Sequence, residues 1–175
     1  VSDVRTIHNF PKTSNIRIDA IKKNETTDAD SLVYVGNLSD IRGLFDMIEV
    51  LAELRDRGRD VKLTCIGEFV TTELERDARS LVRERDLQDT VEFPGYIYYQ
   101  EIFQHLAAAD IGLALLDTDH YKGGIPTKIF EYMYSGSPIV VTDIQAADKY
   151  VSSDWGRIVP ENDTTVQANV ISELL

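Results

Sequence analysis

Cysteine and histidine are scarce in this sequence, and each shortage excludes a kind of site. Cys65 is the only cysteine among 175 residues, so no disulfide can form within the chain and a reducing compartment is expected. The three histidines, His8, His105 and His120, are not spaced with Cys65 as metal ligands are. No Ser-His-Asp or Cys-His order typical of a nucleophilic catalyst is evident either. We therefore expect neither a metal site nor a covalent nucleophile.

Long apolar runs and basic residues are also lacking. No apolar run approaches the roughly 20 residues that span a bilayer, and the first residues do not follow the order of a signal peptide. Lysine and arginine total 18 against 30 aspartate and glutamate residues, which gives a net charge of −12. This balance argues against a nucleic acid or an anionic membrane surface as the main partner, because both select clustered basic residues. These features together predict a cytoplasmic protein.

The overall composition is that of one folded domain. Hydrophobic residues make up 43% and charged residues 27% of the chain, as in a globular rather than a disordered protein. A chain of 175 residues has room for one hydrophobic core. Since it begins at Val1 rather than at a methionine, we expect a fragment of a longer protein.

Short apolar strands alternate with helical patterns from residue 32 onward. The expected strands are 32–35, 61–66, 91–93, 111–116, 138–142 and 156–159, and the expected helices are 44–57, 72–84, 102–107, 126–135 and 164–175. This alternation predicts parallel strands joined by right-handed crossovers. Runs 111–116 and 138–142 lack polar alternation, so helices should cover both faces of the sheet. We predict an α/β fold with a doubly wound, Rossmann-like sheet over 32–175, and a leading segment 1–31, with a short strand at 4–7, packed on it.

The first strand ends in a glycine-bounded loop, 36–43, that carries one cation. In doubly wound sheets, ligands bind outside the carboxyl ends of the strands, where the strand order reverses. Gly36 and Gly43 allow a close approach of the backbone to a ligand, and Arg42 can bind a phosphate with two N–H groups. The loop is neither a G-x-G-x-x-G motif nor a P-loop, so an NAD site is not indicated. A plain turn with a surface arginine is the alternative interpretation.

The stretch 123–143, GGIPTKIFEYMYSGSPIVVTD, is the richest in functional signals. Pro126 suits the first turn of a helix, whose free N–H groups and dipole form an anion site. Lys128 adds a positive charge, and Glu131 projects from the same face three residues later. A phosphate at the helix end and a carboxylate one turn away would suit a nucleotide. The alternative is an exposed Lys128–Glu131 ion pair worth about 0.2–0.5 kcal/mol.

Together with 32–43 and 107–116, this stretch resembles the C-terminal, nucleotide-sugar-binding half of GT-B glycosyltransferases, and most closely the group 1 family, also called family 4. The matching blocks are VYVGNLSDIRGL, VEFPGYIYYQEIFQHLAAADIGLALL, PTKIFEYMYSGSPIVVTD and GRIVPEND. The opening VRTIHNFP is similar to the strand and turn that lead into this half. The resemblance covers nearly the whole chain and implies the strand order 3-2-1-4-5-6, with the donor against the carboxyl edge.

The resemblance also implies roles for single residues. Glu131 falls on the second glutamate of a paired motif and would bind the donor ribose, while Arg42 falls on the loop cation that contacts the diphosphate. The main chain around Gly95, Tyr96 and Ile97 matches the segment beside the base. Residues 124–128 correspond to the loop and helix start that cradle phosphates and sugar. The implied donor-binding set is Gly36, Arg42, Tyr96, Ile97, Gly124, Ile125, Pro126, Thr127, Lys128 and Glu131.

Two positions depart from the family pattern. Gly123 stands where the first glutamate of the pair is expected, and that glutamate usually contacts the transferred sugar. Asn37 replaces the arginine that directly follows the first glycine, which leaves Arg42 as the only cation of the loop. Recognition of the donor sugar is therefore left open by the sequence.

The resemblance implies the donor-binding half of a retaining glycosyltransferase, a hexosyltransferase that uses a UDP- or GDP-sugar and a glycan or lipid-linked acceptor. The acceptor site and a catalytic histidine of the family commonly lie in a separate N-terminal domain, so no catalytic residue is assigned and no activity is expected from this fragment alone. No cofactor and no metal are expected. The expected location is the cytoplasm, and a peripheral position of the full-length enzyme at the inner face of the membrane is left open. The alternatives are half of a sugar-nucleotide epimerase, which shares the GT-B architecture, or a non-catalytic nucleotide-binding or interaction domain.

Overall fold

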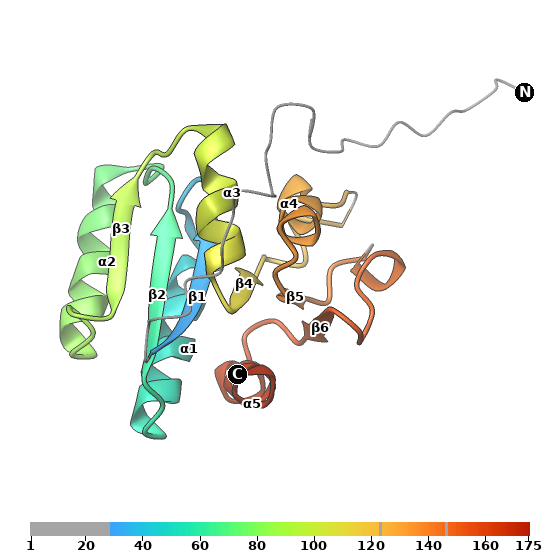
Figure 1. The fold of residues 1–175 in the computed structure, drawn as a ribbon. Coiled ribbons are helices and arrows are strands. Elements are labelled where there is room, and N and C mark those ends of the chain that lie inside the picture. The colour runs from blue at the N-terminus through green and yellow to red at the C-terminus, as the bar shows by residue number, and fades with distance from the viewer. Residues whose placement is uncertain (1–28, 123, 146) are drawn as a thin grey trace, which may run out of the picture.

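Six parallel strands form the centre of the molecule in the computed structural model, which describes residues 29–122, 124–145 and 147–175 (Figure 1). The strands are β1 (Asp30–Val35), β2 (Val61–Ile66), β3 (Val91–Gly95), β4 (Ile111–Ala114), β5 (Ile139–Thr142) and β6 (Gly156–Val159). Their order in the sheet is β3-β2-β1-β4-β5-β6, and every neighbouring pair is parallel. The predicted α/β, Rossmann-like sheet and its strand order 3-2-1-4-5-6 are confirmed.

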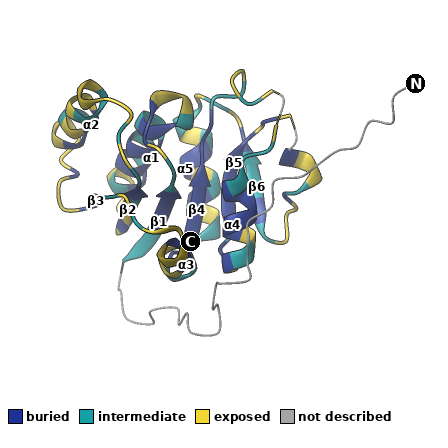
Figure 2. Cartoon of the chain, turned by 90° about the horizontal axis from the view of Figure 1, so that it is seen from above, coloured by how far each residue is buried: buried dark blue, intermediate teal, exposed yellow. Residues whose placement is uncertain are grey.

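Helices cover both faces of this sheet (Figure 2). They are α1 (Leu44–Asp56), α2 (Thr72–Glu84), α3 (Tyr99–Ala108), α4 (Thr127–Ser135) and α5 (Thr164–Leu174), with 3-10 turns η3 (Asp40–Arg42) and η4 (Ala147–Lys149). Buried side chains of α1, α2 and α5 form one apolar cluster with the sheet, and those of α3 and α4 form a second cluster on the opposite face. None of these helices is both long enough and apolar enough to cross a bilayer.

The boundaries of four strands differ from the sequence prediction: β3 extends two residues further, to Gly95, β5 begins one residue later, at Ile139, and β1 and β4 differ as follows. β1 begins at Asp30, two residues before the predicted start, and the suggested strand at 4–7 lies outside the described residues. β4 ends at Ala114, although Leu115 and Leu116 are as buried as the strand itself. The chain turns there because the Leu116 amide leaves the ladder and donates to the Thr142 hydroxyl at 2.9 Å. An apolar run therefore predicted burial correctly but not the end of the hydrogen-bonded strand.

Tyr132 fixes α4 to the sheet at the point where the strand order reverses. Its hydroxyl donates to the Leu113 carbonyl of β4 at 3.0 Å and accepts from the Val35 amide of β1 at 3.3 Å. A Cβ on Gly112 would lie only 2.5 Å from the Tyr132 ring, so glycine lets α4 approach β4 closely. Since β1 and β4 are the first strands of the two halves of the sheet, this contact sets where α4 begins above the carboxyl edge.

Tyr132→Phe is expected to lower the free energy of unfolding by about 1–3 kcal/mol, because a buried amide and a buried carbonyl would lose a hydrogen-bond partner. Urea denaturation measures this loss. Tyr134→Phe, on the same helix and without a hydroxyl contact to the sheet among the described bonds, is the matched control. Equal stabilities of the two variants would contradict the role given to Tyr132.

Candidate functional site

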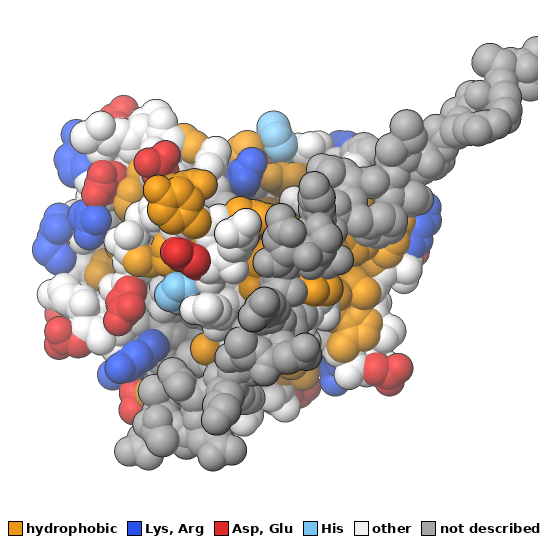
Figure 3. All heavy atoms as spheres, turned by 45° about the horizontal axis from the view of Figure 1, so that its top comes forward, with side chains coloured by type: hydrophobic (Ala, Val, Ile, Leu, Met, Phe, Trp, Pro, Cys, Tyr) orange, Lys and Arg blue, Asp and Glu red, His pale blue; other side chains and the backbone are white. Residues whose placement is uncertain are grey.

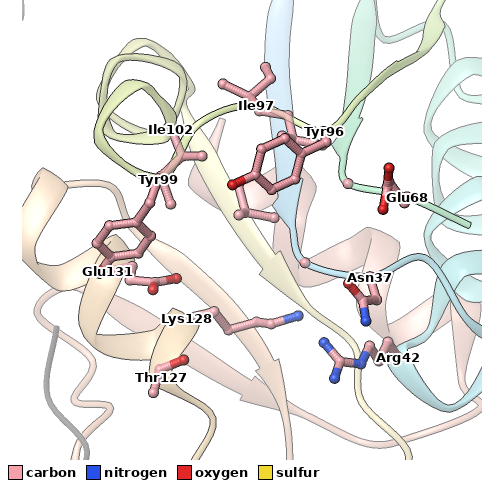
Figure 4. Close-up of a pocket in the computed structure, with 14 residues that line it drawn as sticks. Asn37, Arg42, Glu68, Tyr96, Ile97, Tyr99, Ile102, Thr127, Lys128 and Glu131 are labelled. Carbon is pink, nitrogen blue, oxygen red and sulfur yellow. The ribbon is translucent and has the colours of Figure 1, made fainter. Parts of the chain in front are cut away.

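A pocket of about 280 Å³ opens at the carboxyl edge of the sheet beside the β1–β4 junction (Figure 4). The ends of β1 and β2, the loops that follow β1, β2 and β3, and the helices α3 and α4 contribute to it. The lining residues are Val35, Gly36, Asn37, Arg42, Ile66, Gly67, Glu68, Tyr96, Ile97, Tyr99, Ile102, Thr127, Lys128 and Glu131. The site is thus assembled from two strand ends, three loops and two helices that are far apart in the sequence.

Seven of the ten residues implied by the resemblance line this pocket, namely Gly36, Arg42, Tyr96, Ile97, Thr127, Lys128 and Glu131. The other three, Gly124, Ile125 and Pro126, lead into α4 and do not line it. Pro126 is the N-cap residue of α4 rather than its first helical residue, and Ile125 packs against the apolar cluster of α3 and α4. Gly123, at the position of the expected first glutamate, lies outside the described residues.

Lys128 lies in the first turn of α4 and is buried, with only 5% of its surface exposed. Its Nζ lies 3.7 Å from the centre of the Tyr34 ring and has no hydrogen-bond partner. Burial lowers the pKa of this ammonium well below its usual range, and the nearby Arg42 guanidinium lowers it further. The predicted alternative of an exposed Lys128–Glu131 ion pair is wrong, because both side chains are buried beneath α3 and the strand ends.

Arg42 brings a second cation to the same point. A Cβ on Gly36 would lie 3.3 Å from Arg42 Nη1 and 3.4 Å from Lys128 Nζ, so both cations converge above the bare Cα of this residue. The Tyr34 hydroxyl, which donates to the Asn37 carbonyl at 3.0 Å, also contacts the Arg42 guanidinium. Arg42 is therefore a pocket residue held by its neighbours rather than the surface arginine of a plain turn.

The two glycines of loop 36–43 serve different purposes. Gly36 lines the pocket at a φ of +137°, where a side chain would fill the space between the two cations. Gly43 does not line the pocket, and its Cα faces the Leu115 carbonyl after β4. The expectation that Gly43 brings the backbone close to a ligand is replaced by a packing role, because the crowded atom belongs to the chain itself.

Glu131 supplies the anionic side of the pocket. Its carboxyl group lies one turn after Lys128 on α4, is 8% exposed, and accepts a hydrogen bond from the Tyr99 hydroxyl. Burial raises the pKa of Glu131, while the Tyr99 hydrogen bond and the Lys128 charge oppose this rise. A carboxylate held here can accept hydrogen bonds from hydroxyl groups of a bound molecule.

In the described part of the chain, six of the other eleven Lys and Arg side chains form ion pairs with carboxylates. On the face drawn in Figure 3, basic and acidic side chains are interspersed rather than gathered by sign. On α2, for example, Arg76 pairs with Glu73 and Asp77, and Arg79 pairs with Glu75 at 2.9 Å. Within the described part of the chain, no group of three or more His, Cys, Asp and Glu side chains could hold a metal ion. Arg42 and Lys128 bring two positive charges together at one point of the pocket.

Sequence reasoning missed several pocket residues, above all Glu68, which follows β2, and Tyr99, which opens α3. The rule that ligands meet the carboxyl ends of strands applies to β2 and β3 as well as to β1. Applying it to residues 67–68 would have indicated Glu68. Tyr99 carries no such signal, because its contact with Glu131 depends on the packing of α3 against α4.

The family model described as "Glycosyl transferases group 1" matches residues 29–175. A protein of Escherichia coli strain K12 that is named as a colanic acid biosynthesis glycosyltransferase, WcaL, is 31% identical over 140 residues, which are 78% of this chain and 34% of that protein. The alpha-D-kanosaminyltransferase of Streptomyces kanamyceticus is 28% identical over 149 residues, 85% of this chain and 37% of that enzyme. The chain thus spans about a third of the length of the curated relatives it matches.

Solved structures show the same fold at lower sequence identity. HepE of Anabaena, in complex with UDP and glucose, superposes with a TM-score of 0.74 at 19% identity, covering 83% of this chain and 38% of HepE. The C-terminal domain of the group 1 family protein LpcC from Francisella tularensis superposes with a TM-score of 0.72 at 20% identity, covering 83% of this chain and 74% of that domain. With the family model matched over all of β1 to α5, the chain belongs to the group 1 glycosyltransferase family.

Proposed function

We propose that the chain is the donor-binding part of a retaining glycosyltransferase and that its pocket binds a UDP- or GDP-sugar. The observation that carries this proposal is the buried Lys128 ammonium, which has no hydrogen-bond partner and lies beside Arg42. A buried cation without a hydrogen-bond partner is costly, so a site that keeps one beside a second cation is suited to a multiply charged anion. A diphosphate is such an anion, and the Glu131 carboxylate in the same pocket suits the ribose next to it.

We assign each of the three parts of a nucleotide to a different part of this pocket. The diphosphate would lie over Gly36 between Arg42 and Lys128, at the start of α4, where free N–H groups and the helix dipole add to its binding. The ribose would reach Glu131, and the base would lie against the segment of Tyr96 and Ile97. That HepE was solved with UDP and glucose, and at the same fold, supports a uridine nucleotide as one candidate donor.

The chemical contribution of these residues would be to stabilise the leaving group. When the bond between sugar and diphosphate breaks, negative charge grows on the phosphate that departs. Arg42 and Lys128 are placed to stabilise that charge without rearrangement, as fixed cations do in other transfer reactions. We propose that a second domain binds the glycan or lipid-linked acceptor, and that this chain alone does not transfer sugar, because it spans only about a third of the length of its curated relatives.

Titration of the chain with UDP, GDP and their sugars, followed by amide NMR, tests the proposal. Shifts that cluster at 36–43 and 124–131 would support it. Absence of a response to any nucleotide would overturn it and favour the alternative of a non-catalytic interaction domain. The names of the relatives favour sugar transfer over the epimerase alternative.

Glu131→Gln is expected to weaken the binding of UDP or GDP about tenfold, because a neutral amide is a poorer acceptor for ribose hydroxyls than a carboxylate. Binding of inorganic pyrophosphate, which has no ribose, should change little. Isothermal titration calorimetry measures both affinities. Glu84→Gln on the exposed end of α2 is the control. Equal losses for UDP and pyrophosphate would place Glu131 at the phosphates rather than at the ribose.

A further inference from the structure

Tyr99 is the pocket residue that connects α3 to Glu131 on α4. It is the first residue of α3, it lines the pocket, and its hydroxyl donates a hydrogen bond to the Glu131 carboxylate. Figure 4 shows the Tyr99 ring extending from α3 toward α4, where it lies beside the Glu131 side chain. A side chain that is 40% exposed thus reaches a carboxylate that is almost completely buried.

Aromatic packing fixes the position of the Tyr99 ring. Its centroid lies 5.3 Å from that of Phe103 at 89°, and Phe103 in turn lies 5.7 Å from Tyr134 of α4 at 86°. Phe103 is fully buried between the two helices. Edge-to-face contacts of this kind add to the apolar burial of the rings. These aromatic contacts connect α3 to α4 and hold the Tyr99 hydroxyl next to Glu131.

Few of the described titratable groups interact with the Glu131 carboxyl group and influence its protonation. Among the described residues, the titratable groups that face it are Tyr99 from α3, and Lys128 and Tyr132 from α4. Burial raises the pKa of Glu131, and the Tyr99 hydrogen bond is the largest effect in the opposite direction. Burial and Glu131 together raise the pKa of Tyr99 to about 12, so its hydroxyl stays protonated and remains a donor at neutral pH.

We propose that Tyr99 is a positioning residue for the donor ribose. Its hydroxyl occupies one side of the Glu131 carboxylate and holds the group in one orientation, so that the remaining lone pairs accept hydrogen bonds from the two ribose hydroxyls. This inference rests on the proposed donor site and adds a residue to it. A carboxylate has about four lone-pair sites, which is enough for the tyrosine and for both ribose hydroxyls.

Tyr99→Phe tests this role, because it removes the hydroxyl and keeps the ring that packs on Phe103. The affinity for UDP or GDP is expected to fall about threefold to tenfold, while the affinity for pyrophosphate and for a 2′,3′-dideoxynucleoside diphosphate should not change. The pH at which nucleotide binding is lost on acidification should also move upward, because Glu131 then takes up a proton more easily. Tyr98→Phe is the matched control, since Tyr98 is the adjacent residue, 70% exposed and absent from the pocket lining.

Three other results would overturn the inference. Tyr99→Phe could leave both the ribonucleotide affinity and its pH profile as in the wild type, which would remove any role for the hydroxyl. It could weaken pyrophosphate as much as UDP, with a lower thermal midpoint, which would make the hydroxyl merely structural. Failure of the wild-type chain to bind any nucleotide would overturn the proposed donor site itself, and this is seen before any variant is made.

Discussion

Replacing Lys128 with methionine is expected to weaken the binding of UDP or GDP about 30-fold to 100-fold and, at the same time, to make the free protein more stable by about 1–3 kcal/mol. The two effects have opposite signs because the ammonium group stabilises the complex with an anion but destabilises the free protein, in which it is buried without a hydrogen-bond partner. Lys128 Nζ is buried and has no hydrogen-bond partner. Methionine has nearly the same length, no charge to desolvate, and a sulfur atom that packs well on an aromatic ring such as that of Tyr34.

The difference in stability between Lys128→Met and the wild type should depend on pH, and the direction of this dependence identifies Lys128 as the titrating group. The folded protein holds the pKa of Lys128 well below its usual range, so the unfolded chain binds this proton more readily than the folded one. The stability of the wild type therefore rises with pH between the lowered pKa and the ordinary value of about 10.4. The advantage of Lys128→Met is largest at the acidic end of that window and disappears toward its alkaline end.

Nucleotide binding should also reveal the lowered pKa of Lys128. A bound diphosphate favours the charged ammonium and raises the pKa of Lys128, so binding to the wild type should take up a proton. Titrations in two buffers of different ionisation enthalpy measure this uptake, which should be absent in Lys128→Met. Lys62→Met, on the exposed face of β2, is the control for loss of a positive charge. A destabilised Lys128→Met variant that binds UDP as the wild type does would refute both parts of the prediction.

The burial of Lys128 shows a limit of what can be predicted from the sequence. The alternation of strands and helices predicted the sheet, and the resemblance implied its strand order and most of the pocket residues. A lysine three residues before a glutamate on a helix, however, has the pattern of a solvent-exposed ion pair. The environment of Lys128 comes from Tyr34 on β1 and Cys65 on β2, which are 94 and 63 positions away in the chain. No local pattern carries that information.

Tyr99 illustrates the same limit for a contact between two helices. The segment YIYYQ at 96–100 has three tyrosines without a periodic arrangement, so the sequence does not distinguish them. In the structure, Tyr98 is largely exposed, whereas Tyr99 reaches Glu131. The difference arises because α3 begins at Tyr99, and its first turn faces α4. A boundary of one residue therefore decides that Tyr99 joins Tyr96 in the pocket whereas Tyr98 does not, and boundaries are what sequence patterns predict least well.

The glycines at the ends of two helices allow backbone strain and steric crowding to be separated. Gly43, at the start of α1, and Gly136, at the end of α4, have the same φ of +72°. Alanine at either position would therefore bear a similar cost of the left-handed conformation, about 1–2 kcal/mol. The space around the two residues differs greatly. A Cβ on Gly136 would meet nothing within 4 Å, whereas a Cβ on Gly43 would lie 1.7 Å from the Leu115 carbonyl oxygen.

Gly43→Ala is therefore expected to lower the free energy of unfolding by more than about 4 kcal/mol, and Gly136→Ala by only about 1–2 kcal/mol. The crowded atom on Leu115 is backbone, so it cannot rotate away as a side chain could, and either the end of β4 or loop 36–43 must move. Urea denaturation of both variants gives the two values. Similar losses of stability in the two variants would mean that loop 36–43 can move at little cost in free energy. A large difference would mean that the end of β4 supports the loop rigidly, and this rigidity is what keeps Arg42 close to Lys128 before any ligand binds.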